Sequence, residues 1–274
     1  MTKAAVLTRD PHALTPRAQG VLRVGVRGGN RLDGLRQQGA SKAFFPRHGG
    51  TDLLAVTLNT AGGVTGGDRF ALAGSAAPGS HLTLTTQTAE RIYKAQPGQT
   101  ARMTTDLTVA AGARIDWLPQ ETILFDRARL HRRLTVTLAP DARFLGVETL
   151  VLGRALMGER VGTALLKDDV RILRDGELVF ADAIALDGAV SDRMAAAWCG
   201  GPAGCIASVT CVAPDAERHL PRLRALMPAT GGVSLIRDGI LFARLLMPDS
   251  FEMRRALIPI LTALRGPLPP TWTM

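Results

Sequence analysis

Aromatic residues make up only 4% of the 274-residue chain, and Tyr93 is its single tyrosine. This scarcity argues against an aromatic stacking platform for single-stranded nucleic acid. The cysteines are few and odd in number (Cys199, Cys205 and Cys211), and the N-terminal sequence has no apolar segment typical of a signal peptide. We therefore expect a cytoplasmic protein with reduced, buried and unreactive thiols. Glycine or glutamate interrupts the longest apolar stretches before they reach the ~18 residues that a membrane helix needs.

Acidic residues are also in short supply, since 24 Asp and Glu stand against 33 Lys and Arg, giving a formal net charge of +9. The resulting positive electrostatic field attracts acidic partners in general and does not by itself indicate whether the partner is nucleic acid, membrane or protein. The densest basic run holds Arg127, Arg129, His131, Arg132 and Arg133. No aromatic residue interrupts this run, so we interpret it as a solvated or partner-facing edge rather than a nucleic-acid site.

Hydrophobic residues at 46% are sufficient for a sizeable core, and their pattern indicates repeated strands. Between residues 70 and 150 an alternating segment, a small turn and a second alternating segment occur three times, with turns at Gly79, Gly112 and Asp141. Each copy predicts one strand-turn-strand unit, either a β-hairpin or a β-coil. Asp-Gly pairs at 175–176 and 238–239 predict two further hairpins. We expect a mainly β fold in which these units stack into a wound, β-helix-like sheet structure.

Two segments in the C-terminal third, 215–227 and 249–265, show helical spacing of apolar residues. Asp249 or Ser250 is the expected N-cap of the second helix, and Gly266 follows its basic last turn. Both helices are expected to pack on the core, with an exposed stripe that docks a partner as the alternative. No composition shift divides the chain, so we predict one domain over 1–274 with flexible ends at about 1–16 and 267–274.

Motifs that would define an enzyme are not found. The glycine-rich stretch 59–70 lacks the Lys-Ser/Thr of a phosphate loop, because Gly67 is followed by Asp68 and then by a predicted strand. The histidines form no HExxH pattern, and the cysteines are spaced C-x5-C-x5-C. Acidic residues in otherwise uncharged surroundings remain as candidates for chemistry: Asp68, Glu90, Glu121, Asp126, Glu148 and Glu159. Ion pairs and turns are their simpler interpretation, and a β-rich hydrolase with paired carboxylates is the alternative.

Four ordered motifs resemble the urease accessory protein family UreD, also called UreH. They are NTAGGVTGGDRF (59–70), TTQTAERIYKA (85–95), WLPQETILFDRARLHR (117–132) and ETLVLGRALMGE (148–159). The alternation of apolar and polar residues continues on both sides of the motifs, so the resemblance covers almost the whole chain. It implies a mainly β protein wound from stacked strands with two helices, in agreement with the repeats.

The resemblance further implies a non-enzymatic chaperone that binds urease apoprotein and recruits UreF and the GTPase UreG in a hetero-oligomer. Nickel is then delivered to the urease active site, through a tunnel inside this protein. No tightly bound cofactor, nucleic acid or membrane is implied. The six acidic residues named above fall within the motifs and become candidates for a transient Ni²⁺ path. The resemblance assigns Arg91, Tyr93, Arg127 and Arg154 to ion pairs that hold the turns or to the partner surface.

Overall fold

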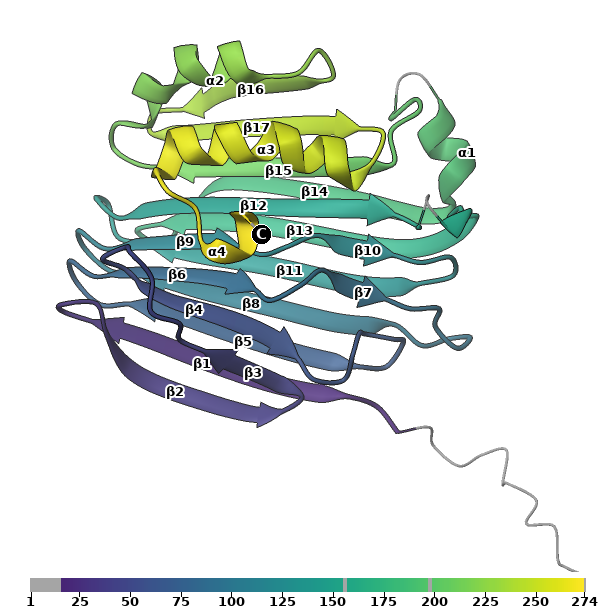
Figure 1. Ribbon diagram of the computed structural model, residues 1–274, viewed down its shortest axis with the longest axis horizontal. Coiled ribbons are helices and arrows are strands. Elements are labelled where there is room, and N and C mark those ends of the chain that lie inside the picture. The colour runs from purple at the N-terminus through teal and green to yellow at the C-terminus, as the bar shows by residue number, and fades with distance from the viewer. Residues whose placement is uncertain (1–15, 155–156, 197–198, 274) are drawn as a thin grey trace, which may run out of the picture.

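Two β-sheets face each other along the length of the molecule (Figure 1). The computed structural model describes residues 16–154, 157–196 and 199–273. Sheet A has the strand order β14-β13-β11-β8-β5-β1-β2. Its strands are β1 (Gln19–Arg27), β2 (Arg31–Gly39), β5 (Arg69–Ala76), β8 (Ala101–Val109), β11 (Arg129–Leu138), β13 (Thr163–Arg174) and β14 (Glu177–Ala189).

Sheet B has the order β16-β17-β15-β12-β9-β6-β4-β3, and the short strands β7 and β10 pair beside β12. Its strands are β3 (Ser41–Phe44), β4 (Leu53–Asn59), β6 (His81–Thr86), β7 (Glu90–Ile92), β9 (Arg114–Leu118), β10 (Thr122–Leu124), β12 (Arg143–Leu152), β15 (Cys205–Val212), β16 (Gly231–Arg237) and β17 (Ile240–Met247). The chain crosses repeatedly between the sheets, which makes the mainly β fold predicted from the repeats a β-solenoid of about four turns.

The three sequence repeats are β-coils rather than hairpins. Within each repeat the strand before the turn joins sheet A and the strand after the turn joins sheet B. As a result β5, β8 and β11 pair in parallel in one sheet, and β6, β9 and β12 pair in parallel in the other. Gly79 and Gly112 occupy the left-handed region (φ +67° and +62°), as these sharp turns require.

Both Asp-Gly pairs form the predicted hairpins. Asp175 and Gly176 have φ values of +54° and +80° and connect the antiparallel strands β13 and β14. Gly239 (φ +72°) connects β16 to β17, and a Cβ atom there would lie 2.8 Å from the carbonyl oxygen of Ala213. These turns fix the register of the antiparallel strands at one end of the solenoid.

The core lies between the sheets because apolar side chains alternate along each strand. Leu107 and Val109 of β8 and Val136 of β11 are buried against Ile115 of β9 and Phe144 of β12. Successive side chains of a strand point to opposite faces, so each β-coil contributes one apolar row from each sheet. The stack of coils therefore shares one continuous core.

Helix α3 (Ser250–Arg265) begins and ends as predicted. The Asp249 side chain accepts a hydrogen bond from the backbone N–H of Glu252 at 2.9 Å, and Gly266 follows the last turn at φ +88°. Its buried Leu257 and Ile260 pack on sheet B, which agrees with the core-packing interpretation. The segment 215–227 forms a short 3₁₀ helix (Ala216–His219) and α2 (Leu220–Leu226).

Two short helices were not predicted, α1 (Val190–Ala195) and α4 (Pro270–Thr273). The second lies within the end expected to be flexible, 267–274, and its Trp272 is only 2% exposed. Its indole N–H donates to the carbonyl oxygen of Leu118 at 2.9 Å. The expected flexible end at 1–16 lies, apart from Pro16, outside the described residues.

A buried polar cluster attaches α3 to sheet B. The carboxylate of Asp116 is fully buried and accepts from Arg114 (2.7 Å), His81 (2.9 Å) and Arg265 (2.8 Å). Arg265 also reaches Asp52 at 2.9 Å. Burial alone would raise the pKa of Asp116, but the hydrogen bond from His81 and the positive charges of Arg114 and Arg265 outweigh it and lower the pKa to about 2.

Replacing Arg265 by methionine is expected to lower the free energy of unfolding by about 3 kcal/mol, because two buried carboxylates lose a cation. Urea denaturation of the full chain measures this change. Arg255→Met is the matched control, since the Arg255–Glu252 pair of the same helix is exposed and such pairs contribute about 0–1 kcal/mol. Equal losses in the two variants would contradict the anchoring role of Arg265.

Candidate functional site

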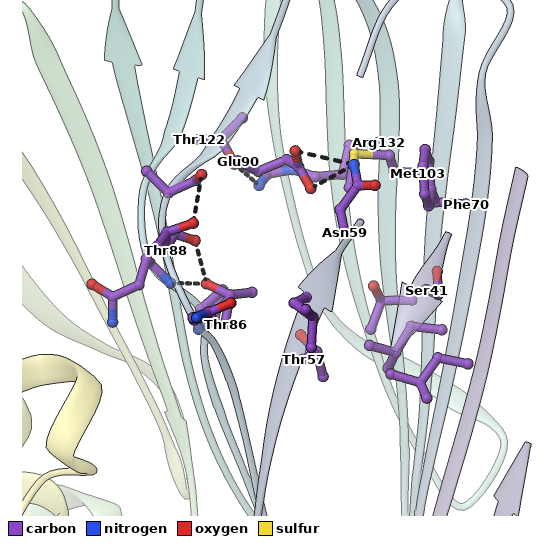
Figure 2. A pocket seen from close by; sticks show the side chains of 18 of the residues that line it. Ser41, Thr57, Asn59, Phe70, Thr86, Thr88, Glu90, Met103, Thr122 and Arg132 are labelled. Atoms are coloured by element: carbon purple, nitrogen blue, oxygen red, sulfur yellow. Dashed lines mark hydrogen bonds between the residues drawn. The ribbon is translucent and has the colours of Figure 1, made fainter. Parts of the chain in front are cut away.

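A cavity of about 210 Å³ lies between the two sheets. It is located where β6 and β9 end and, after residues 87–89 and 119–121, the short strands β7 and β10 begin. The pairing of β6 with β9 ends at these breaks, and the space between the sheets is left incompletely filled. The side chains that line it include Thr57, Phe70, Leu72, Glu90, Met103, Thr105, Trp117, Thr122, Arg132, Leu134 and Glu148 (Figure 2).

The cavity reaches the molecular surface beside the segment 86–91. Gly62, Thr88 and Arg91 contribute to its lining and are exposed. The opposite wall is formed by inward side chains of β5, β8 and β11. The site is thus an internal pocket with one rim at the surface, a shape suited to holding or passing a small polar species.

Glu90 is the carboxylate at this rim. It is aligned with Thr122 of β10, so both side chains share the face of sheet B that is directed toward the cavity. The side-chain amide of Asn59 donates to both Glu90 oxygens at 3.4 Å, and the backbone N–H of Arg91 donates at 3.2 Å (Figure 2). Burial raises the pKa of Glu90 to about 7, although the hydrogen bonds from Asn59 and Arg91 oppose the rise. Glu90 therefore exchanges a proton near neutral pH.

A buried ion-pair cluster, here called the Arg132 cluster, closes the inner part of the cavity. Arg132 of β11 is 12% exposed and contacts Glu148 of β12 at 2.6 Å (Nη1 to Oε2). It also contacts Asp168 of β13 at 2.9 Å (Nε to Oδ1) and donates to the Thr122 hydroxyl at 2.9 Å. The Trp117 indole donates to the other Glu148 oxygen at 2.7 Å. The cluster joins sheet A to sheet B. Burial raises the pKa of Glu148, and the charge of Arg132 opposes that rise.

The acidic partners of Arg132 stabilise its charged form. Burial alone would lower the pKa of a guanidinium, but the charges of Asp168 and Glu148 raise the pKa of Arg132 above its ordinary value. One cation thus faces two largely buried carboxylates. Glu148 and Glu90 line the same cavity with different partners, an arginine for the first and an amide for the second.

Asp68 and Glu121 lie outside the cavity lining. The Asp68 carboxylate is buried and accepts from the backbone N–H groups of Ala18 and Thr65, both at 2.8 Å, so it holds the glycine-rich loop as a turn. Glu121 lies 3.7 Å from Arg254 of α3. Both carboxylates thus have local partners that account for their positions.

Asp126 and Glu159 come together in a surface cluster. Asp126 contacts Arg127 at 3.1 Å and Glu159 contacts Arg154 at 2.7 Å, while the backbone N–H of Asp126 donates to Glu159 at 3.4 Å. The backbone N–H of Thr163 is the main cause of the lowered pKa of Asp126, with Arg127 assisting. These contacts hold the turn between β10 and β11 against the segment that follows β12.

Tyr93 holds the loop above the cavity. Its ring packs edge-on against Phe125 at a centroid distance of 5.0 Å, and its hydroxyl donates to the carbonyl oxygen of Gly62 at 3.2 Å. A Cβ atom at Gly63 would lie 2.3 Å from this ring, so only glycine fits there. Arg91, the fourth residue grouped with Tyr93, Arg127 and Arg154, is exposed at the cavity rim.

The basic run 127–133 is not one exposed edge. Strand alternation in β11 directs Arg132 inward, whereas His131 and Arg133 lie on the outer face. The expectation for Arg132 was therefore wrong, and the period-two pattern of Leu130, Leu134 and Val136 was the signal that could have corrected it. Asp168 and Asn59 were also missed. Asp168 occupies an inward position between the buried Leu166 and Val170, an unusual place for a carboxylate.

The thiols and other potential metal ligands are dispersed. Burial raises the pKa of the Cys205 and Cys211 thiols to about 12, which agrees with unreactive thiols. Cys199 differs from the expectation, because it is exposed. Within residues 16–154, 157–196 and 199–273, no three His, Cys, Asp or Glu side chains are grouped closely enough to hold a metal ion. None of the helices in these ranges is long and apolar enough to cross a bilayer.

Together, the fold and the cavity define a two-sheet β-solenoid protein with an internal pocket lined by apolar side chains and a few polar and charged ones. A family model described as UreD urease accessory protein matches residues 17–272. A protein named urease accessory protein UreD from Ruegeria pomeroyi is 45% identical over 89% of this chain and 95% of its own length. Proteins of the same name from Ruegeria sp. TM1040 and Xanthobacter autotrophicus are 48% and 43% identical, over 94% and 98% of this chain and 91% and 94% of their own lengths. The chain belongs to the UreD family of urease accessory proteins.

Glu90→Gln is expected to raise the free energy of unfolding by about 1–3 kcal/mol at pH 8, with a smaller gain at pH 5. The folded-state pKa of about 7 lies above the unfolded value near 4.5, so the native carboxyl favours folding at low pH and loses that contribution as pH rises through 7. Urea unfolding at pH 5, 6, 7 and 8 measures the difference. A difference that stays constant across this range would contradict the assignment.

Arg132→Met is expected to cost about 3–5 kcal/mol of stability, because Glu148 and Asp168 are left buried without their cation. Adding Glu148→Gln and Asp168→Asn to that variant should restore part of the loss. Arg133→Met is the matched control on the same strand, since its pair with Asp169 is long at 4.0 Å and exposed. Thermal or urea unfolding of Arg132→Met, of the triple variant and of Arg133→Met measures the three losses of stability. Equal losses for Arg132→Met and Arg133→Met would refute the inward cluster.

Proposed function

We propose that this protein is a urease maturation chaperone that acts in the cytoplasm. In this proposal it binds urease apoprotein together with UreF and the GTPase UreG in a hetero-oligomer, so that nickel reaches the urease active site. The observation that carries the proposal is membership of the UreD family over residues 17–272. The relatives that match nearly the full chain are themselves named urease accessory proteins.

The cavity between the sheets is our proposed passage for Ni²⁺. An ion in transit needs ligands that bind and then release it, and carboxylate and hydroxyl oxygens hold nickel less firmly than a thiolate cage. Glu90 supplies a carboxylate whose hydrogen-bond partner is the neutral Asn59 amide, and threonines line the adjacent wall. Because its pKa lies near 7, Glu90 can take up the cation as it loses its proton and release the cation as it regains one.

The other carboxylates are proposed to shape the passage or the surface rather than to bind the ion. Glu148 lines the cavity but is held by Arg132, so it forms part of the wall. Asp126 and Glu159 are engaged by Arg127 and Arg154. Asp68 is occupied by backbone N–H groups, and Glu121 faces Arg254.

A hydrolase that uses paired carboxylates is not favoured by the arrangement. Such an enzyme needs one carboxylate free to attack or to accept a proton and a second that donates one. Of the two carboxylates among the described residues that line the cavity, Glu148 is paired with Arg132 and bonded to Trp117. We therefore propose a role without turnover of its own.

The test uses cells that carry the urease subunits and the remaining accessory genes, with and without this chain. Urease activity and the nickel content of purified urease should both fall sharply without it and return when it is supplied. Full activity and nickel content in its absence would overturn the proposed function.

In the same cells, Glu90→Gln is expected to lower the nickel content of urease at least about two-fold, because the amide cannot take up a cation in exchange for a proton. Glu121→Gln is the matched control, since it makes the same chemical change at a residue that lies outside the cavity lining. Co-purification of each variant with its partners checks that assembly is intact. Unchanged nickel content with Glu90→Gln would remove Glu90 from the path.

A further inference from the structure

The outer face of sheet A is a broad β surface on which the described helices do not pack. Helices α2 and α3 contact strands of sheet B, and Trp272 of α4 bonds to Leu118 of β9 (Figure 1). Helix α1 lies beside the ends of β13 and β14. The central strands β5, β8 and β11 therefore present their outward side chains away from all four helices.

Basic side chains form a row across this face. Arg69 of β5 is aligned with Arg102 of β8, Arg102 with His131 of β11, and His131 with Lys167 of β13. Aligned residues of parallel strands point to the same face, and neighbouring strands lie ~4.8 Å apart, so the four residues span about 14 Å. We call Arg69, Arg102, His131 and Lys167 the basic row.

The charges of the basic row are not balanced within the described chain. Arg69, Arg102 and Lys167 are exposed, and none of them lies within 4.0 Å of an acidic group in the ranges that the structure describes. His131 sits between them, and its Nε2 atom is buried without a hydrogen-bond partner in those ranges. Burial lowers the pKa of His131, and the nearby charges of Arg102 and Lys167 lower it further, while Asp169 opposes them.

We propose that the basic row is a docking surface for a helix of a protein partner that carries acidic side chains at one-turn intervals. An α-helix advances 5.4 Å per turn, close to the ~4.8 Å between strands. A helix laid across the strands therefore brings one carboxylate to each basic side chain in turn. The inference rests on the proposed function, because the helix would belong to a partner in the maturation complex.

The charges beside the row favour a single helix over nucleic acid. The exposed Asp106 lies on β8 on the same face, and Asp169, whose pair with Arg133 is long at 4.0 Å, lies two residues from Lys167 on β13. A nucleic-acid duplex is wider than an α-helix and carries phosphates on two strands. It would cover these carboxylates and be repelled by them. A helix 10–12 Å across can follow the row and leave them in solvent.

The first experiment uses cells that lack this chain. They receive one of three proteins: the wild type, the row variant R69E/R102E/K167E or the control variant R47E/R222E/R224E. The control triplet reverses three exposed charges that lie outside sheet A. Co-purification of accessory proteins and urease is expected to fall at least about ten-fold for the row variant alone, a change of about 1.4 kcal/mol in binding. Circular dichroism melting checks that all three proteins are folded. If wild type restores urease and the row variant binds and restores equally, the docking surface is overturned while the proposed function stands.

The second experiment needs no urease and tests the surface directly. A helical peptide with glutamates at i, i+4, i+7 and i+11 is compared with one of equal composition whose glutamates are spread around the helix. We expect the striped peptide to bind wild type at least about ten-fold more tightly than the spread peptide, and to lose that preference on R69E/R102E/K167E. Equal binding of the two peptides, or no binding, overturns the inference. Displacement of the striped peptide by a short DNA duplex at lower concentration would overturn it in favour of a nucleic-acid surface.

Discussion

The in-register stacking of parallel strands determines which side chains meet in this molecule. Once β5, β8, β11 and β13 are aligned, each position in a strand is repeated by its neighbours on the same face. Apolar rows such as Leu107 and Val136 then bury one another between the sheets. The same alignment brings Arg132 beside Asp168 inside the molecule and His131 beside Lys167 outside it. A shift of one residue would exchange these two faces, so the core, the cavity wall and the basic row depend on one register.

The cavity combines this regular stack with a local break in sheet B. Where β6 and β9 end, polar side chains enter a space that is elsewhere filled by apolar ones. Burial raises the pKa of both glutamates, and their partners oppose the rise by different means. Arg132 contacts Glu148 directly at 2.6 Å, whereas Glu90 has hydrogen bonds from Asn59 and from the backbone of Arg91, together with the nearby Arg91 charge. Two glutamates in one cavity thus acquire different chemistry from their neighbours alone.

Much of the fold was predictable because local patterns encode it. The repeats, the Asp-Gly turns and the capped helix at 249–265 each depend on residues close together in sequence, and each is confirmed. The choice between hairpin and coil was open, since alternation within a strand does not specify which sheet the strand joins. Trp272 was placed in a flexible end because its partner, the carbonyl of Leu118, lies 154 residues away.

The candidate site was predictable in part, and for a similar reason. Four ordered motifs led to the UreD family, which the match over residues 17–272 confirms. Of the six carboxylates that those motifs contain, Glu90 and Glu148 line the cavity. The motifs alone could not separate these two from Glu121, because the distinction depends on partners that are distant in sequence: Asn59 for Glu90, Arg132 for Glu148 and Arg254 for Glu121.

The attachment of α3 to sheet B also affects the order in which the molecule can be completed during synthesis. Arg265 contacts Asp52, which the ribosome makes 213 residues earlier. Coils of a solenoid can form one after another as the chain emerges, because each contacts mainly its neighbours. Asp52 and Asp116, however, stay without this guanidinium until α3 has left the exit tunnel. The nascent solenoid therefore carries under-compensated carboxylates on sheet B for most of its translation, and it gains their shared cation only when α3 docks, late in synthesis.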